Sequence, residues 1–252
     1  MDVAIRGNRA SCLSLQLGPR SWVFAVARGF GTVDGVGAAP AALERLRTEC
    51  ERRLRTERFR RAVDRVQAAP AALLGVLARV NGEIFARGAS NADYVTAGCS
   101  MTLALVVRGY ACVMHTGGTA AYLAHRGEVT ALTGEDALHE APIELLGRAL
   151  GTTPSLDVSV SNVSFAADDV MILLGHRVRG DVDRRALIEH IERAGDSEHM
   201  LVVRFDESDR AIEELAKPVS PVVAYRAPLR VRAALFAAAA ASILALLTAW
   251  AR

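Results

Sequence analysis

The stretch Gly98–Thr133, GCSMTLALVVRGYACVMHTGGTAAYLAHRGEVTALT, decides the fold predicted for this chain. It contains four short apolar runs: Met101–Val107, Tyr110–His115, Ala120–Ala124 and Val129–Leu132. Arg108-Gly109 separates the first two runs, and His125–Glu128 separates the last two. Both segments suit tight hairpin turns. The pattern predicts an antiparallel meander. Because the runs are nearly continuous in apolar character, we expect their sheet to be covered on both faces, as in the core of a β-sandwich.

Three segments of this stretch carry a resemblance to a known family: Gly98-Cys99-Ser100, Thr116–Leu123 and Leu132–Asp136. They resemble the G-T-T, V-G-D-S-R-A-Y-L and L-T-x-D-H elements of the metal-dependent serine/threonine phosphatases of the PPM type, often called type 2C. Gly118 stands where the second element of the family has an aspartate.

Further segments match the same family in order along residues 1–206. These are Arg6–Ala10, similar to R-x-N-E-D; Ile143–Gly151; Val170–Leu174, with the loop after it; and Met200–Phe205, similar to the closing strand. The resemblance implies an α+β fold, a four-layer α/β/β/α sandwich of two antiparallel sheets flanked by helices.

The remaining elements are predicted from apolar spacing and turn residues. We expect strands at Ser21–Ala27, Leu156–Val163 and Val170–Leu174, and helices at Pro40–Arg60, Pro70–Gly88, Pro142–Leu150 and Asp181–Ala194. Met1–Leu17 carries no clear element, and Gly29–Gly37 reads as a glycine-rich loop.

The residues at the metal-binding positions of the family depart from its pattern. The aligned acid positions hold Arg9, Arg28, Gly118, His176 and Asp196, and Gly29 stands where the family offers a backbone carbonyl. Mg²⁺ and Mn²⁺ prefer hard oxygen ligands, mostly carboxylates, and a guanidinium repels a divalent cation. We therefore expect no bound metal, no cofactor and no catalytic residue, with Asp196 as the only retained acid. We also predict an ion pair between Arg28 and Asp196.

Two other uses of these residues stay open. Arg6, Arg9 and Arg28 are candidates for binding phosphate without a metal. The alternative is that nearby acids merely neutralise them. Among the histidines, only His176 and His199 could converge with Asp196 to form a transition-metal site. The other interpretation is that they are ordinary polar histidines.

Composition limits the function further. The chain of 252 residues has 30 basic and 28 acidic residues, a formal net charge of +2, which gives no indication of a nucleic-acid partner. Four cysteines show neither a C-x-x-C pair nor a zinc spacing: Cys12, Cys50, Cys99 and Cys112. We expect them to be reduced thiols, as in the cytoplasm.

The C-terminal part predicts a membrane anchor. Residues 233–251 contain no charge and would span roughly 28 Å as a helix. Residues 207–232 form a proline-containing juxtamembrane linker whose arginines place the domain on the cytoplasmic side, at the inner membrane. The alternative is a helix buried against a partner.

The arginines of Pro40–Arg61 favour a solvated helix with Glu–Arg pairs. Docking of this helix on anionic lipid or on an acidic partner is the alternative.

Together these features predict a membrane-anchored, catalytically inactive relative of the PPM phosphatases that acts in signalling. Its partner would be a kinase, a phosphoprotein or another phosphatase. One alternative is an active metal-dependent phosphatase with an unusual ligand set, which would use Mg²⁺ or Mn²⁺. A second alternative is a structural subunit of a membrane complex.

Overall fold

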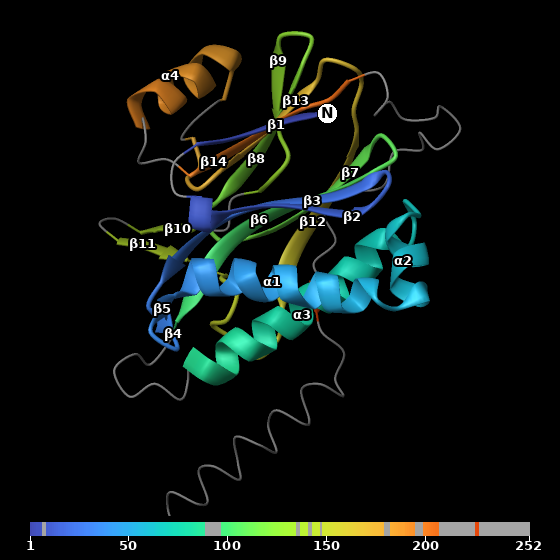
Figure 1. Ribbon diagram of the computed structural model, residues 1–252. Helices are drawn as coiled ribbons and strands as arrows, with labels where there is room; N and C mark the ends of the chain where they lie inside the picture. The colour runs from blue at the N-terminus through green and yellow to red at the C-terminus, as the bar shows by residue number, and fades with distance from the viewer. Residues whose placement is uncertain are drawn as a thin grey trace, which may run out of the picture.

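Two antiparallel sheets pack face to face, and helices cover the outer face of each (Figure 1). This computed structural model describes residues 1–6, 9–88, 97–134, 137–140, 143–146, 148–178, 182–194, 199–206 and 225–226. The α/β/β/α layering predicted from the family resemblance is confirmed over these residues.

Each large sheet takes strands from both halves of the chain. The five-stranded sheet has the order β1 (Asp2–Arg6), β14 (Met200–Arg204), β13 (Val170–Leu174), β8 (Ala120–His125) and β9 (Glu128–Ala131). The six-stranded sheet has the order β15 (Tyr225–Arg226), β12 (Asp157–Ser164), β7 (Tyr110–Thr116), β6 (Gly98–Val107), β3 (Ser21–Phe30) and β2 (Cys12–Gly18). All pairings within both sheets are antiparallel.

The other elements are short hairpins and helices. The hairpins are β4 (Thr32–Val33) with β5 (Val36–Gly37), and β10 (Ala137–Glu140) with β11 (Ile143–Leu146). The helices are the 3₁₀ turn η1 (Arg9–Ser11), α1 (Ala38–Leu54), α2 (Glu57–Val63), α3 (Ala69–Gly88) and α4 (Arg184–Ala194). Helices α1 and α3 lie on the six-stranded sheet, whereas α4 lies on the opposite side of the molecule (Figure 1).

The buried apolar side chains form three clusters, one between each pair of adjacent structural layers. On β3, Phe24 and Val26 point into the layer between the sheets, and Val23 and Ala25 point toward α1 and α3. The third cluster, which includes Tyr122, lies between the five-stranded sheet and α4. Central strands are therefore apolar on both faces, which explains their continuous apolar sequence.

The meander predicted from the four apolar runs is divided between the two sheets. Strands β6 and β7 pair in one sheet, and β8 and β9 pair in the other. The chain crosses over at Gly117–Thr119, where Gly117 has a φ of 89°. The prediction of a single meander was wrong. Strands that are buried on both faces show no alternation of apolar and polar residues, so the sequence does not indicate which of the two sheets each strand joins.

Three further predictions need correction. The helix expected at Pro142–Leu150 is wrong, since Ile143–Leu146 pairs as β11 with β10. The helix expected at Pro40–Arg60 is two helices, because Thr56 is extended and the chain turns there. This turn places Phe59 and Val63 of α2 in the core. The stretch Met1–Leu17, to which no element was assigned, contributes two edge strands, β1 and β2.

The C-terminal predictions fall largely outside the described residues. The span predicted at 233–251 lies outside the described residues, and so does most of the linker 207–232. The exception in the linker is β15, which pairs with Asp157 and Val158 of β12. Among the described helices, α3 is long and apolar enough to cross a bilayer. Its residues Leu73, Val76 and Ile84 are buried in the layer against the six-stranded sheet, as expected for a core helix.

Candidate functional site

Among the described residues at metal-site positions of the family, Arg28, Gly118 and His176 lie at one end of the two sheets, which we call the motif end. In the six-stranded sheet, Arg28 of β3 pairs with Ser100 of β6. In the five-stranded sheet, Leu174 of β13 pairs with Ala120 of β8 and with Met200 of β14. The chain passes directly from the end of β7 to the start of β8, so these strand ends lie at the same end of the molecule.

The layer between the sheets changes from apolar to polar at the motif end. Alternation along β3 places Arg28 on the same face as Phe24 and Val26, and alternation along β6 places Ser100 and Thr102 on the face of Ala104. Arg28 is exposed, which shows that the layer opens to solvent there. A guanidinium therefore lies on the inter-sheet face of this opening.

Behind Arg28 lies a buried polar network. The Thr102 hydroxyl contacts His115 Nδ1 at 2.9 Å and the Thr119 hydroxyl at 2.7 Å. The three side chains are at most 1% exposed. This network joins β6, β7 and the crossover into β8, and it fixes the position of the crossover.

The crossover itself packs tightly on Ser100. The backbone N–H of Gly118 donates a hydrogen bond of 2.9 Å to Ser100 Oγ, and a Cβ atom at Gly117 would lie 2.2 Å from the same oxygen. Gly29 is equally constrained, since a Cβ there would lie 2.4 Å from the backbone nitrogen of Ala39 in α1. Gly29 and Gly117 are thus required for packing on their neighbours.

The other sheet contributes histidines to the motif end. The N–H of Gly175 donates to the carbonyl oxygen of His199 at 2.7 Å, which brings the loop after β13 beside the residue before β14. His176 follows in this loop. Among the described residues, Nδ1 of His199 is buried and has no hydrogen-bond partner. His176 and His199 therefore lie at the same end of the five-stranded sheet.

Arg177 ties the loop after β13 to the segment after β9. Its guanidinium donates to the carbonyl oxygens of Thr133 and Gly134, the former at 3.0 Å. The N–H of Val178 donates to the hydroxyl of the fully buried Tyr122 at 3.1 Å. No sequence pattern indicates the contacts of Arg177, because both of its acceptors are backbone carbonyl groups.

The donors at the motif end do not fit a binuclear Mg²⁺ or Mn²⁺ site. Arg28, Gly118 and His176 stand at three of the aligned acid positions, and none supplies a carboxylate. Within the ranges that the structure describes, no three His, Cys, Asp or Glu residues are grouped so that they could hold a metal ion. The side chains of Arg6 and Arg9 and the whole of Asp196 lie outside the described parts, as does the predicted ion pair between Arg28 and Asp196.

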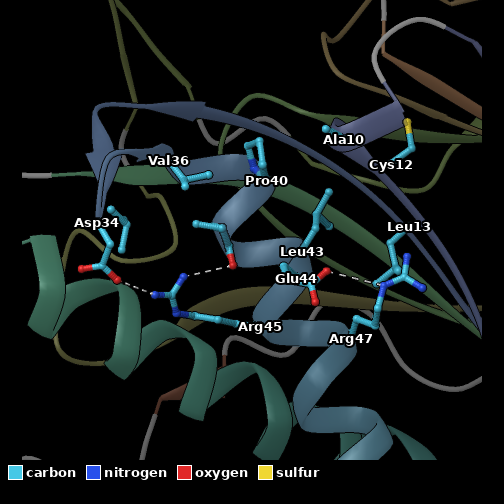
Figure 2. Close-up of a pocket in the computed structure, with 12 residues that line it drawn as sticks. Ala10, Cys12, Leu13, Asp34, Val36, Pro40, Leu43, Glu44, Arg45 and Arg47 are labelled. Atoms are coloured by element: carbon cyan, nitrogen blue, oxygen red, sulfur yellow. Dashed lines mark hydrogen bonds and ion pairs between the residues drawn. The ribbon is translucent and has the colours of Figure 1, made fainter.

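A pocket of about 380 Å³ lies beside β2, between α1 and the β4–β5 hairpin (Figure 2). Apolar side chains such as Leu13, Val36 and Leu43 line it. Asp34, in the hairpin turn, accepts a hydrogen bond of 3.1 Å from Arg45 on α1 and forms an ion pair with Arg87 on α3. These ion pairs hold the hairpin against both helices. The sequence analysis missed Asp34, since only the folded chain brings the two arginines to it.

The cysteines are buried thiols, as predicted. All four are free and buried. Burial raises the pKa of Cys50, Cys99 and Cys112 to about 12. None of these three thiols is available as a thiolate nucleophile at neutral pH.

Comparisons with known proteins identify the fold. A scan of protein-family models finds no match to the sequence, and a search of curated proteins finds none either. Among solved structures, the chain is similar to the PPM Ser-Thr phosphatase MsPP from Mycobacterium smegmatis, crystallised with cacodylate. The identity is 22% and the TM-score 0.57, over 82% of this chain and 97% of MsPP.

Two other solved structures show the same likeness. One is PppA, described as a key regulatory component of T6SS in Pseudomonas aeruginosa, with 17% identity, a TM-score of 0.57, and 81% and 96% of the two chains covered. The other is the serine/threonine phosphatase Stp1 from Staphylococcus aureus, with 10% identity, a TM-score of 0.62, and 82% and 94% covered. The likeness runs over almost the whole length of these proteins. The chain therefore has the fold of the PPM-type serine/threonine phosphatases.

Proposed function

We propose that this chain is a non-hydrolytic protein of the PPM fold that binds a phosphorylated protein or a signalling partner at a membrane. The observation that carries the proposal is Arg28 at the motif end. Its guanidinium stands where the family resemblance implies a metal-bridging carboxylate, and it lies at the solvent opening of the layer between the sheets.

Arg28 favours an anion at this end in place of a metal ion. A guanidinium presents paired N–H donors that match the oxygens of a phosphate group. The hydroxyl of Ser100, its neighbour across the strands, adds a polar group on the same inter-sheet face. Arg6 and Arg9 are the further candidates for phosphate contacts, and they enter the proposal from the sequence alone.

A regulatory role is consistent with the fold. PppA is described as a regulatory component, and we extend this role to the present chain as part of the proposal. The apolar segment 233–251 would hold the domain at the inner face of a membrane. A kinase, a phosphoprotein or another phosphatase is the partner class that such a protein would bind.

The test is hydrolysis and binding by the full chain in detergent. We expect no turnover of p-nitrophenyl phosphate or of a phosphothreonine peptide above a heat-denatured control, with or without Mn²⁺, and no heat on calorimetric Mn²⁺ titration. Turnover that requires Mn²⁺ would overturn the proposal and favour the active phosphatase with relocated ligands.

Phosphate binding is tested by Arg28→Ala. We expect this variant to bind the phosphothreonine peptide at least tenfold more weakly, since a charge-assisted hydrogen bond contributes about 1.5–3 kcal/mol. Arg184→Ala is the matched control, because Arg184 is an exposed arginine on α4, away from the motif end. Equal affinities of the two variants would exclude Arg28 from phosphate binding.

A further inference from the structure

The outer surface of α1 and α2 is strongly basic. Between Glu44 and Gln67 the chain carries nine arginines and five acidic residues, a net charge of +4. We call the exposed arginines of this segment and of the turn after it the basic face: Arg52, Arg55, Arg58, Arg60, Arg61 and Arg65.

Part of this charge is compensated within the helices. Glu49, with 8% of its side chain exposed, binds Arg52 and Arg53 at 2.7 Å, and Glu57 pairs with Arg60 and Arg61. Arg55, Arg58 and Arg65 are exposed and form no ion pair with any residue that the structure describes. These three cations remain available for an external partner.

The opposite face of the molecule is neutral. From Asp183 to Arg193, α4 and its N-cap carry three arginines and three carboxylates. Arg185 and Arg193 both pair with Glu189. The charge therefore distinguishes the two helical faces and favours contact between the α1–α2 side and a negative surface.

The C-terminal chain leaves from the sheet that α1 and α3 cover. Arg226 of β15 pairs with Asp157 at the start of β12, and Val158 belongs to the apolar layer beneath these helices. The apolar segment begins at position 233, and seven residues reach roughly 23 Å when extended. The outer surface of a helix layer lies about 15 Å from its sheet, within this reach. The outer surface of α4 lies about 25 Å from the same sheet, across the second sheet.

We propose that the basic face lies on an anionic lipid surface, with Arg55, Arg58 and Arg65 against the headgroups. This inference rests on the proposed membrane attachment and names its orientation. The inner leaflet carries acidic lipids that attract arginines close to it. The motif end is then held at a fixed height beside the membrane.

The experiment uses the full chain and vesicles of phosphatidylcholine, with or without 30% phosphatidylserine. A dye is attached through Gln67→Cys beside the basic face, or through Glu192→Cys on α4 as the control; both positions are exposed, and the native cysteines are buried. We expect a headgroup quencher to reduce fluorescence at position 67 in vesicles with phosphatidylserine, and to leave position 192 unchanged.

Charge variants assign the effect to the three free arginines. Arg55→Gln/Arg58→Gln/Arg65→Gln should abolish the quenching at position 67, and high salt should do the same. Arg126→Gln/Arg185→Gln/Arg193→Gln removes three arginines from the α4 side and should leave it intact. A quenching signal equal in both kinds of vesicle, or unchanged in the first variant, would overturn the proposal.

Flotation distinguishes lipid contact by the basic face from membrane anchoring by the apolar segment 233–251. Flotation with neutral vesicles reports the apolar segment, whatever the basic face does. If the protein floats only with phosphatidylserine, and the first variant floats roughly 10- to 100-fold less, the basic face is supported and the anchor is wrong. If it floats with neither, both are wrong. An anchored protein without quenching at position 67 overturns the lipid contact alone and leaves an acidic protein as the occupant.

Discussion

Gly117 packs directly on Ser100, because a Cβ atom at Gly117 would lie 2.2 Å from Ser100 Oγ. The contact lies where the chain crosses from one sheet to the other. Gly117 also has a φ of 89°, a backbone conformation that costs an L residue roughly 1–2 kcal/mol.

Gly117→Ala should therefore destabilise the protein by both strain and steric overlap. We expect a loss of at least about 3 kcal/mol in the free energy of unfolding, measured by urea denaturation. Gly127→Ala is the control, since Gly127 has a similar φ of 92° but no atom within 4 Å of its Cβ position. It should lose only about 1–2 kcal/mol. Equal losses would show that the contact with Ser100 contributes nothing.

Asn81 joins α3 to the segment between β11 and β12 by two hydrogen bonds. Its Nδ2 donates to the carbonyl oxygen of Thr153 at 3.0 Å, and its Oδ1 accepts from the N–H of Gly151 at 2.8 Å. The side chain is 1% exposed. Asn81→Ala should cost about 2–4 kcal/mol of unfolding free energy, because it leaves buried groups without partners.

The control for this variant is Asn162→Ala on β12. Asn162 is half-buried and its side chain makes no hydrogen bond with the described residues, so the same truncation there should cost less than about 1 kcal/mol. Asn81→Asp should cost at least as much as Asn81→Ala, because its buried carboxylate would face the carbonyl oxygen of Thr153 without a donor between them. A stable Asn81→Ala protein would contradict the assignment.

Glu49 links acid stability to α1. Hydrogen bonding from Arg52, together with Arg53, lowers the pKa of the Glu49 carboxyl to about 2, against the opposing effect of burial. A carboxyl whose pKa is lowered on folding stabilises the native state above its unfolded pKa of 4.5, and this contribution is lost as the pH falls through 2.

We expect Glu49→Gln to lower the free energy of unfolding at pH 7 by about 1–3 kcal/mol, since the two arginines lose the negative charge and one of the two acceptor oxygens that they share. Solvent screening at Arg52 limits this loss. The difference from wild type should shrink between pH 4.5 and pH 2. Glu44→Gln, at an exposed position on the same helix, is the control and should show neither effect. A pH-independent difference would assign the loss to packing instead.

The buried thiols should resist alkylation. With a pKa near 12, Cys50, Cys99 and Cys112 are almost entirely protonated at pH 8. We expect iodoacetamide at pH 8 to modify these residues only after denaturation, as measured by mass spectrometry of peptides. Rapid modification of Cys99 in the folded protein would show that β6 opens at the motif end.

The sequence predicted the central strands that are buried on both faces and missed the edge strands β1 and β2. Met101–Val107 is apolar throughout and was recognised as a strand; Asp2–Arg6 lies at a sheet edge, with Val3 39% exposed, and carries no burial pattern. The short run at Ile143–Leu146 fits a helix or a strand equally well, and only its pairing with β10 decides between them. No proline or glycine marks the break at Thr56.

The candidate site was predicted through the family motifs and only in part. Arg28, Gly118 and His176 lie at one end of the fold, and their assignment to metal-site positions stays a prediction from the order of the motifs along the chain. Thr102 and His115 were read as parts of apolar strands. Polar side chains inside otherwise apolar runs were the available signal, since buried polar groups require partners that only the folded chain supplies.

The pairing of β1 with β14 has a consequence for the order of folding. Arg6 pairs with Met200, and Asp2 with Arg204, so the first strand of this sheet along the chain pairs with its last strand. At about 5–20 residues per second, synthesis of the intervening chain takes on the order of 10–40 s. During this time β1 has no partner strand, so its edge is open to pairing with another chain. The five-stranded sheet thus closes only after β14, which pairs with both β1 and β13, has been synthesised.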